Sequence, residues 1–231
     1  MKIFEIKSDA DLELMVERLE GLREVEASEN GGGEAENLVT EILDLERKED
    51  RIEGVFSRDF VRRRQFRRKL IENLATEEAP FWIKPFRGRA FLIVLAPSVA
   101  RGVKKLLTNH VANKLSEAIF GKTGAVVETR ISDETLRELH ESNPQATKLI
   151  WFDDVDIPGV DKLCLAGSGL ADTKLYRDYL EHGRIWYVVF EVQKRKIVVG
   201  ITRNCVVTLF SKSTVDEFID YILDDILMIL E

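Results

Sequence analysis

The chain has 231 residues and a formal net charge of −7 at pH 7, and 45% of its residues are hydrophobic and 32% are charged. This apolar content excludes a disordered chain, and the acidic balance argues against general affinity for nucleic acid or an anionic membrane. Any site for a polyanion must therefore be local.

The N-terminal sequence mixes charged with apolar residues, so it lacks the uninterrupted apolar core of a signal peptide. No apolar run approaches the roughly 20 residues that a membrane span needs. Glutamine is scarce while Glu, Lys and Arg are abundant, a bias associated with thermophiles. We expect a soluble, cytoplasmic protein with no membrane partner.

In the first half, short alternating apolar runs predict strands at residues 1–6, 23–27, 38–45, 52–56, 81–86 and 90–95. Helical spacing predicts a helix over 9–20, with Ser8 as its N-cap and Asp11 completing a capping box. A longer helix is predicted over 98–119, with a core stripe of Val99, Val103, Leu107, Val111, Leu115 and Ile119.

Between these elements lies a strongly basic stretch, Arg58–Lys69, with seven basic residues and one acid. Phe66, Leu70 and Leu74 follow one another at helical spacing, together with Ile71. This spacing predicts a helix over residues 62–74.

The second half predicts a similar order of elements. Strands are expected at residues 125–131, 148–152, 162–166, 185–192, 196–202 and 205–210. Helices are expected after Ser132, over 173–180, and from a cap formed by Ser213 and Asp216 to Leu230.

Because strand, Ser-Asp cap and helix recur, we interpret the chain as two α+β repeats, residues 1–121 and 122–231. Each would form a mostly antiparallel sheet with helices on one face. This order of elements is similar to that of the TATA-binding-protein-like fold. The resemblance is one of element order alone, so it implies nothing about activity or about DNA-contacting residues.

The basic stretch is the main candidate site. Arginines interleaved with aromatic rings suit nucleic acid, because the guanidinium groups contact phosphates and the rings stack on bases. The alternative is that these arginines pair with the protein's own acids. The candidate nucleic-acid-binding residues are Arg62, Arg63, Arg64, Phe66, Arg67, Arg68 and Lys69, helped by Lys104 and Lys105 of the long helix.

Other patterns predict no catalytic, metal or cofactor site. Asp153, Asp154 and Asp156 could attract a divalent cation but do not match an EF-hand, so a solvated loop is expected there. Cys164 and Cys205 fit neither a disulfide framework nor a zinc module. The chain has three histidines and no nucleophile and base pair at a suggestive spacing.

The sequence therefore predicts a non-catalytic binding module of unknown pathway, with nucleic acid as the favoured partner. The alternative is a protein-interaction or self-assembly subunit, such as a homo-oligomer, in which the basic stretch meets an acidic protein surface. The two predicted closing helices carry charges of opposite sign, which fits this alternative. The first carries Arg101, Lys104, Lys105 and Lys114, and the second carries Asp216, Glu217, Asp220, Asp224 and Asp225.

Overall fold

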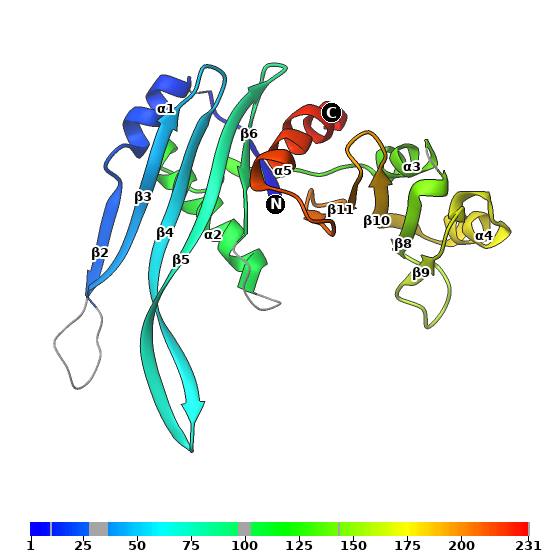
Figure 1. The fold of residues 1–231 in the computed structure, drawn as a ribbon, viewed down its shortest axis with the longest axis horizontal. Coiled ribbons are helices and arrows are strands. Elements are labelled where there is room, and N and C mark those ends of the chain that lie inside the picture. Colours follow the sequence, from blue (N-terminus) through cyan, green and yellow to red (C-terminus); the bar gives the residue numbers. More distant parts are fainter. Residues whose placement is uncertain (10, 28–36, 97–102, 143, 231) are drawn as a thin grey trace. The chain divides into compact units, whose positions relative to one another are not determined.

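The structure is a computed structural model that describes residues 1–9, 11–27, 37–96, 103–142 and 144–230. It is an α+β protein with two compact units, Met1–Val127 and Glu128–Glu231 (Figure 1). The described residues form five α-helices and two antiparallel sheets, one in each unit.

The first unit contains a seven-stranded sheet in the order β2-β3-β4-β5-β6-β1-β7. Its strands are β1 (Lys2–Ile6), β2 (Arg23–Ala27), β3 (Asn37–Arg47), β4 (Ile52–Phe66), β5 (Lys69–Phe86), β6 (Arg89–Val94) and β7 (Val126–Glu128). Helices α1 (Leu12–Leu19) and α2 (Val103–Phe120) pack on this sheet in one hydrophobic cluster. The predicted strands of this half are confirmed, as is the burial of Leu107, Val111, Leu115 and Ile119 along α2.

The second unit contains a five-stranded sheet in the order β12-β11-β10-β8-β9. Its strands are β8 (Thr147–Asp153), β9 (Leu163–Ala166), β10 (Arg184–Val192), β11 (Ile197–Thr202) and β12 (Val207–Leu209). Its helices are α3 (Asp133–Glu141), α4 (Lys174–His182) and α5 (Val215–Tyr221), and α5 continues as a π turn over Ile222–Ile226 and a 3₁₀ turn over Leu227–Ile229.

Of the predicted helix caps, only Ser132 is confirmed, since its hydroxyl accepts a hydrogen bond from the Thr135 amide. Helix α1 is capped by Asp11 and not by Ser8, and helix α5 by a capping box of Thr214 and Glu217. In both corrections the cap lies within a few residues of the predicted one, because a run of Ser, Thr and Asp offers several competing caps.

The predicted helix over residues 62–74 is wrong, because these residues belong to strands β4 and β5, which form one long hairpin. Residues four apart share a helix face, but they also share a strand face because four is a multiple of two. The spacing of Phe66, Leu70 and Leu74 therefore fits both a helix and a strand. The turn between the strands is Arg67–Arg68, which has none of the usual turn residues.

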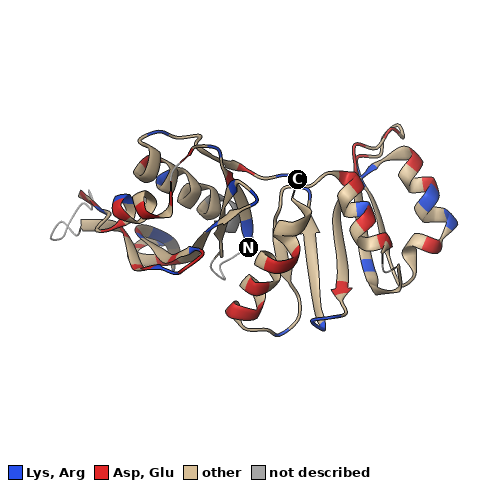
Figure 2. Ribbon diagram, turned by 90° about the horizontal axis from the view of Figure 1, so that it is seen from above, with Lys and Arg blue, Asp and Glu red and all other residues tan. Residues whose placement is uncertain are grey.

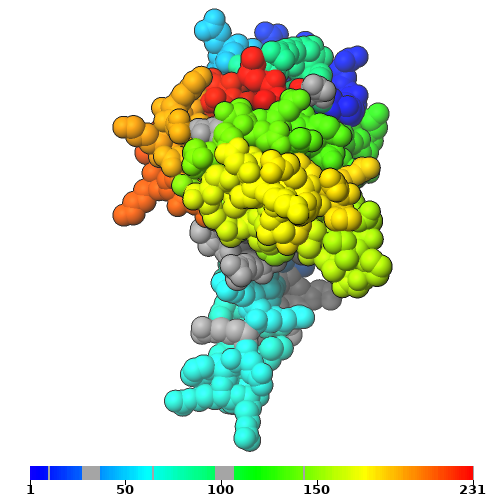
Figure 3. Space-filling view, turned by 90° about the vertical axis from the view of Figure 1, so that its right-hand side faces the viewer, coloured from blue at the N-terminus to red at the C-terminus, as the bar shows by residue number. Residues whose placement is uncertain are grey.

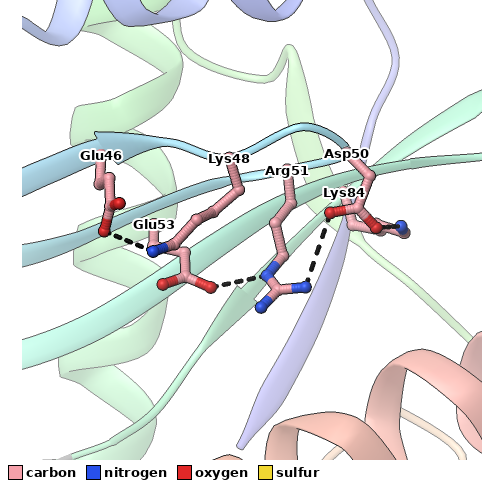
Figure 4. A network of polar contacts seen from close by, with 6 residues as sticks. All are labelled: Glu46, Lys48, Asp50, Arg51, Glu53 and Lys84. Atoms are coloured by element: carbon pink, nitrogen blue, oxygen red, sulfur yellow. Dashed lines mark hydrogen bonds and ion pairs between the residues drawn. The ribbon is translucent and has the colours of Figure 1, made fainter.

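At the end of the sheet where β3 turns into β4, the charged side chains pair with one another (Figure 4). Lys48 pairs with Glu46, and Arg51 pairs with Glu53, each at 2.6 Å. Lys84 of β5 hydrogen-bonds Asp50, and this contact lowers the pKa of the Asp50 carboxyl. These charges hold the turn against the neighbouring strand.

Gly54 of β4 lies directly across the strand pair from Phe81, whose side chain is fully buried. A Cβ atom at Gly54 would lie 2.8 Å from Cζ of Phe81 and 3.3 Å from Cδ1 of Leu45. Gly54→Ala should therefore lower the free energy of unfolding by about 1–3 kcal/mol, as urea denaturation would measure. Gly54→Ala combined with Phe81→Leu should cost less than the sum of the two single changes, because the shorter side chain relieves the close contact. An unchanged urea midpoint in Gly54→Ala would contradict the close contact.

Candidate nucleic-acid interface

Strands β4 and β5 extend past the sheet that carries them as a twisted two-stranded ribbon (Figures 1 and 3). The pairing of β3 with β4 ends at Arg58, and that of β6 with β5 begins at Phe81. Beyond these points only β4 and β5 pair with each other, up to Phe66 and Lys69. We call Asp59–Thr76 the arm. Its strands are about 25 Å long, at roughly 3.3 Å per residue.

Asp59 holds the base of the arm in place. One carboxylate oxygen accepts a hydrogen bond from the backbone amide of Val39 on β3, at 3.1 Å. The other accepts one from the hydroxyl of Thr76 on β5, at 2.6 Å. The arm therefore begins at a fixed point of the sheet, and its only acid on β4 is occupied there.

The pairing register divides the arm into two faces, because directly opposed residues of antiparallel strands lie on the same side. Arg62 is opposed to Asn73 and Phe66 to Lys69, whereas Arg63 is opposed to Glu72. We call the first side the basic face; it holds Phe60, Arg62, Phe66, Lys69, Ile71, Asn73 and Ala75. The opposite face holds Asp59, Val61, Arg63, Gln65, Leu70, Glu72, Leu74 and Thr76.

The two acids of the arm lie on the opposite face, and both have partners within the arm. Glu72 accepts a hydrogen bond from Nε of Arg63 at 2.6 Å, and Asp59 binds Thr76. In the described part of the chain the side chains of Arg62, Arg68 and Lys69 form no ion pair or hydrogen bond. The basic face is thus free of carboxylates, and Arg62 and Lys69 on it have no acidic partner among the residues that the structure describes.

The turn at the tip, Arg67–Arg68, has an uncommon backbone. Both residues have positive φ, 47° and 65°, as in a type I′ turn. Such turns favour Asn-Gly, since a left-handed conformation costs other residues roughly 1–2 kcal/mol each. Two arginines here place charge at the end of the arm at the expense of local stability.

The second hairpin tip of the same sheet provides a comparison. β5 and β6 are joined by Arg87–Gly88, so a glycine takes one of the two positive-φ positions. Arg89, which follows this turn, donates two hydrogen bonds of 2.8 Å to the Glu5 carboxylate. This contact lowers the pKa of Glu5 to about 2. Here the basic residue is used within the fold, in contrast to Lys69 after the first turn.

The structure brings six of the nine predicted site residues together on the arm with described side chains. Arg62, Phe66 and Lys69 lie on the basic face, Arg67 and Arg68 at the tip, and Arg63 on the opposite face. Phe66 is 54% exposed, and the guanidinium carbon of Arg67 lies 5.4 Å from its ring centroid. The backbone of Arg64 pairs with Ile71, but its side chain is outside the described part.

Lys104 and Lys105 lie in the first turn of α2. This helix begins near the end of the sheet beyond which the arm extends (Figure 1). Their side chains, and Arg101, lie outside the described residues. Sequence reasoning missed Asn73 and Ile71, because only the strand register places them on the basic face. Alternation of apolar and polar residues along 69–74 is too irregular to have identified them.

The other sequence candidates have structural partners. Both carboxylate oxygens of Asp153 accept hydrogen bonds of 2.6 Å from Arg203, and Asp154 lies 3.5 Å from the same guanidinium. Asp156 hydrogen-bonds Nδ1 of His182 at 2.9 Å. Among the described residues no three His, Cys, Asp or Glu side chains are grouped as metal ligands. The described helices include none that is long and apolar enough to cross a membrane.

No protein-family model matches the chain, and no curated protein matches it.

Proposed function

We propose that this chain is a non-catalytic module that binds nucleic acid through the basic face and tip of the arm. The observation that carries this proposal is that Arg62, Arg68 and Lys69 have no acidic partner among the described residues. In an otherwise acidic chain, these cations form a local positive site suited to phosphates.

The strained tip supports the same proposal. A hairpin selected for stability alone would carry Asn-Gly at positions 67 and 68. Residues held in costly backbone conformations concentrate at functional sites, where another requirement offsets the cost. At this tip the requirement is positive charge, which two exposed arginines place at the end of the arm.

Loss of cations from the basic face should reduce the salt dependence of binding. For Arg62→Ser with Lys69→Ser, the slope of log K against log salt should become shallower by about 2, since each phosphate contact contributes about 0.9. Fluorescence anisotropy with labelled DNA between about 50 and about 200 mM salt would measure this slope.

The matched control is Arg63→Ser with Glu72→Ser, which removes an ion pair from the opposite face and leaves the net charge of the arm unchanged. This control should retain the wild-type slope. Equal slopes for the two double variants would contradict the assignment to the basic face. Absence of wild-type binding at about 50 mM salt would contradict nucleic-acid binding itself.

A second candidate function, protein interaction or self-assembly, rests on a different observation. Leu70 and Leu74 on the opposite face are 66% and 39% exposed. Helix α5 carries Asp216, Glu217 and Asp220 and is acidic along its length (Figure 2). A mass above the monomer in light scattering, reduced by Leu70→Ser with Leu74→Ser, would favour this function.

The internal duplication into residues 1–121 and 122–231, with the element order of a TATA-binding-protein-like fold and a cytoplasmic location, stays a proposal. Its support is the shared order of helix, strands and closing helix in the two units, although the strand before α3, β7, belongs to the sheet of the first unit. The arm of the first unit and helix α4 of the second occupy the same place in that order. Under this proposal, the arm is the element by which the first copy has diverged.

A further inference from the structure

We infer that the arm binds double-stranded DNA by entering its major groove with the basic face directed at the base edges. This inference rests on the proposed function, and it specifies the form of nucleic acid and the groove. Three properties of the arm carry it: its width, the chemistry of the basic face, and the limited access to its aromatic rings.

The width of the arm selects the groove. Paired strands lie about 4.8 Å apart, and side chains at both edges widen the ribbon further. The major groove of B-form DNA, about 12 Å wide, admits a two-stranded ribbon, whereas the minor groove, about 6 Å wide, does not without distortion. The major groove of A-form RNA is deep and narrow, so it excludes the arm as well.

The basic face carries groups that complement base edges in that groove. Arg62 and Lys69 are donors for the O6 and N7 acceptors of guanine. Asn73, opposed to Arg62, has the amide that pairs with adenine, and Ile71 is an apolar group of the kind that contacts the thymine methyl. No carboxylate interrupts this face, since Glu72 and Asp59 lie on the opposite one.

Single-stranded nucleic acid fits the arm less well. Binding of single strands relies on aromatic faces that are open for stacking. On the basic face Phe60 is half-buried, and Arg67 already lies over the ring of Phe66. One partly covered ring does not make a stacking platform for successive bases.

Four probes distinguish the groove from the other modes of binding. The first is a duplex of about two helical turns, and the second is the same duplex with glucosylated 5-hydroxymethylcytosine, which fills the major groove. The third is the plain duplex with netropsin in its minor groove, and the fourth is one separated strand. We expect at least about tenfold weaker binding to the glucosylated duplex and to the single strand, and no change with netropsin.

Substitution of an uncharged residue tests contact with the bases separately from contact with the phosphates. Asn73→Ala should weaken binding to the plain duplex about tenfold with an unchanged salt slope. Gln65→Ala, at an exposed position of the opposite face, should bind as wild type does.

Equal binding to plain and glucosylated duplex, competition by netropsin, or tighter binding to the single strand would each overturn major-groove entry while leaving nucleic-acid binding intact. An Asn73→Ala variant that binds like wild type would also overturn it. Failure to bind any of the four probes would instead refute the proposed function.

Discussion

Shortening the arm to a two-residue turn is expected to abolish nucleic-acid binding without unfolding the protein. Val61 and Leu74 are directly opposed in the β4–β5 pair, so replacing Arg62–Asn73 by Asn-Gly would close the hairpin in its native register. All six predicted cations of the basic stretch from Arg62 to Lys69 leave with this segment. Affinity should fall by about a thousandfold or more, to the background of an acidic protein.

The fold should survive because the arm contributes nothing to the hydrophobic core. The core cluster of the first unit includes Phe56 on β4 and Ala79 on β5, and no described residue between them belongs to it. Asp59 and Thr76, which hold the base of the arm, are retained. The urea midpoint should therefore shift little, and an Asn-Gly turn replaces a strained one.

The matched control keeps the full arm and changes its tip alone. Arg67→Asn with Arg68→Gly should raise stability slightly, because both residues suit positive φ, while weakening binding in proportion to the two lost charges. A shortened protein that unfolds would show that the arm supports the fold. A folded, shortened protein that still binds DNA would place the site elsewhere.

The sequence was sufficient to predict most strands and helices, because their apolar residues alternate or recur over a full element. It failed at the arm, where Phe66, Leu70 and Leu74 fit both periods and Arg67–Arg68 has no turn signal. The candidate cations were identified from composition, which does not depend on the type of element. Their division into two faces required the register, which places Arg63 with Glu72 and Arg62 with Asn73.

The pairing also changes what the basic stretch can do chemically. On the predicted helix, Arg62, Arg63, Arg67 and Arg68 would have been spread around a cylinder that is partly held down by Phe66, Leu70 and Leu74. On a ribbon, the unpaired cations lie on one face and at the tip, and the acids lie on the other. An arrangement with one carboxylate-free side can approach a polyanion closely, because no like charge opposes it.

Acidification between pH 6.5 and pH 4 is expected to destabilise the second unit through His140. This imidazole is 1% exposed, and burial lowers its pKa from 6.5 to about 4. Its Nε2 lies 2.8 Å from the hydroxyl of Tyr176, which donates to Oε1 of Glu141 at 2.8 Å. One hydroxyl proton cannot serve both bonds, so Nε2–H donates to Tyr176. The remaining nitrogen, Nδ1, is buried and has no partner among the described residues.

Protonation of His140 would therefore place a second N–H in a buried position without an acceptor. In the unfolded chain the imidazole binds a proton near pH 6.5, but in the folded chain only near pH 4, so the unfolded state binds more protons between these values. This contribution to stability is fully present above pH 6.5 and is lost as the pH falls to 4. The free energy of unfolding should decrease by about 3 kcal/mol over that window.

Urea denaturation at a series of pH values measures this decrease, and His140→Gln is the control because its amide can reach Tyr176 but does not titrate. The contribution of Glu141 to stability can be told apart from that of His140, because it is lost in a different pH range. Burial acts to raise the pKa of its carboxyl, but hydrogen bonds from Arg137 and Tyr176 leave it lowered, so its contribution is lost only as the pH falls below about 4.5. His140→Gln should therefore remove most of the decrease between pH 6.5 and about 4.5 and leave the decline at lower pH. A smaller decrease stays in that window, because burial also lowers the pKa of the half-buried His110. A wild-type profile that is already flat above pH 4.5 would show that the imidazole finds a proton acceptor inside the fold.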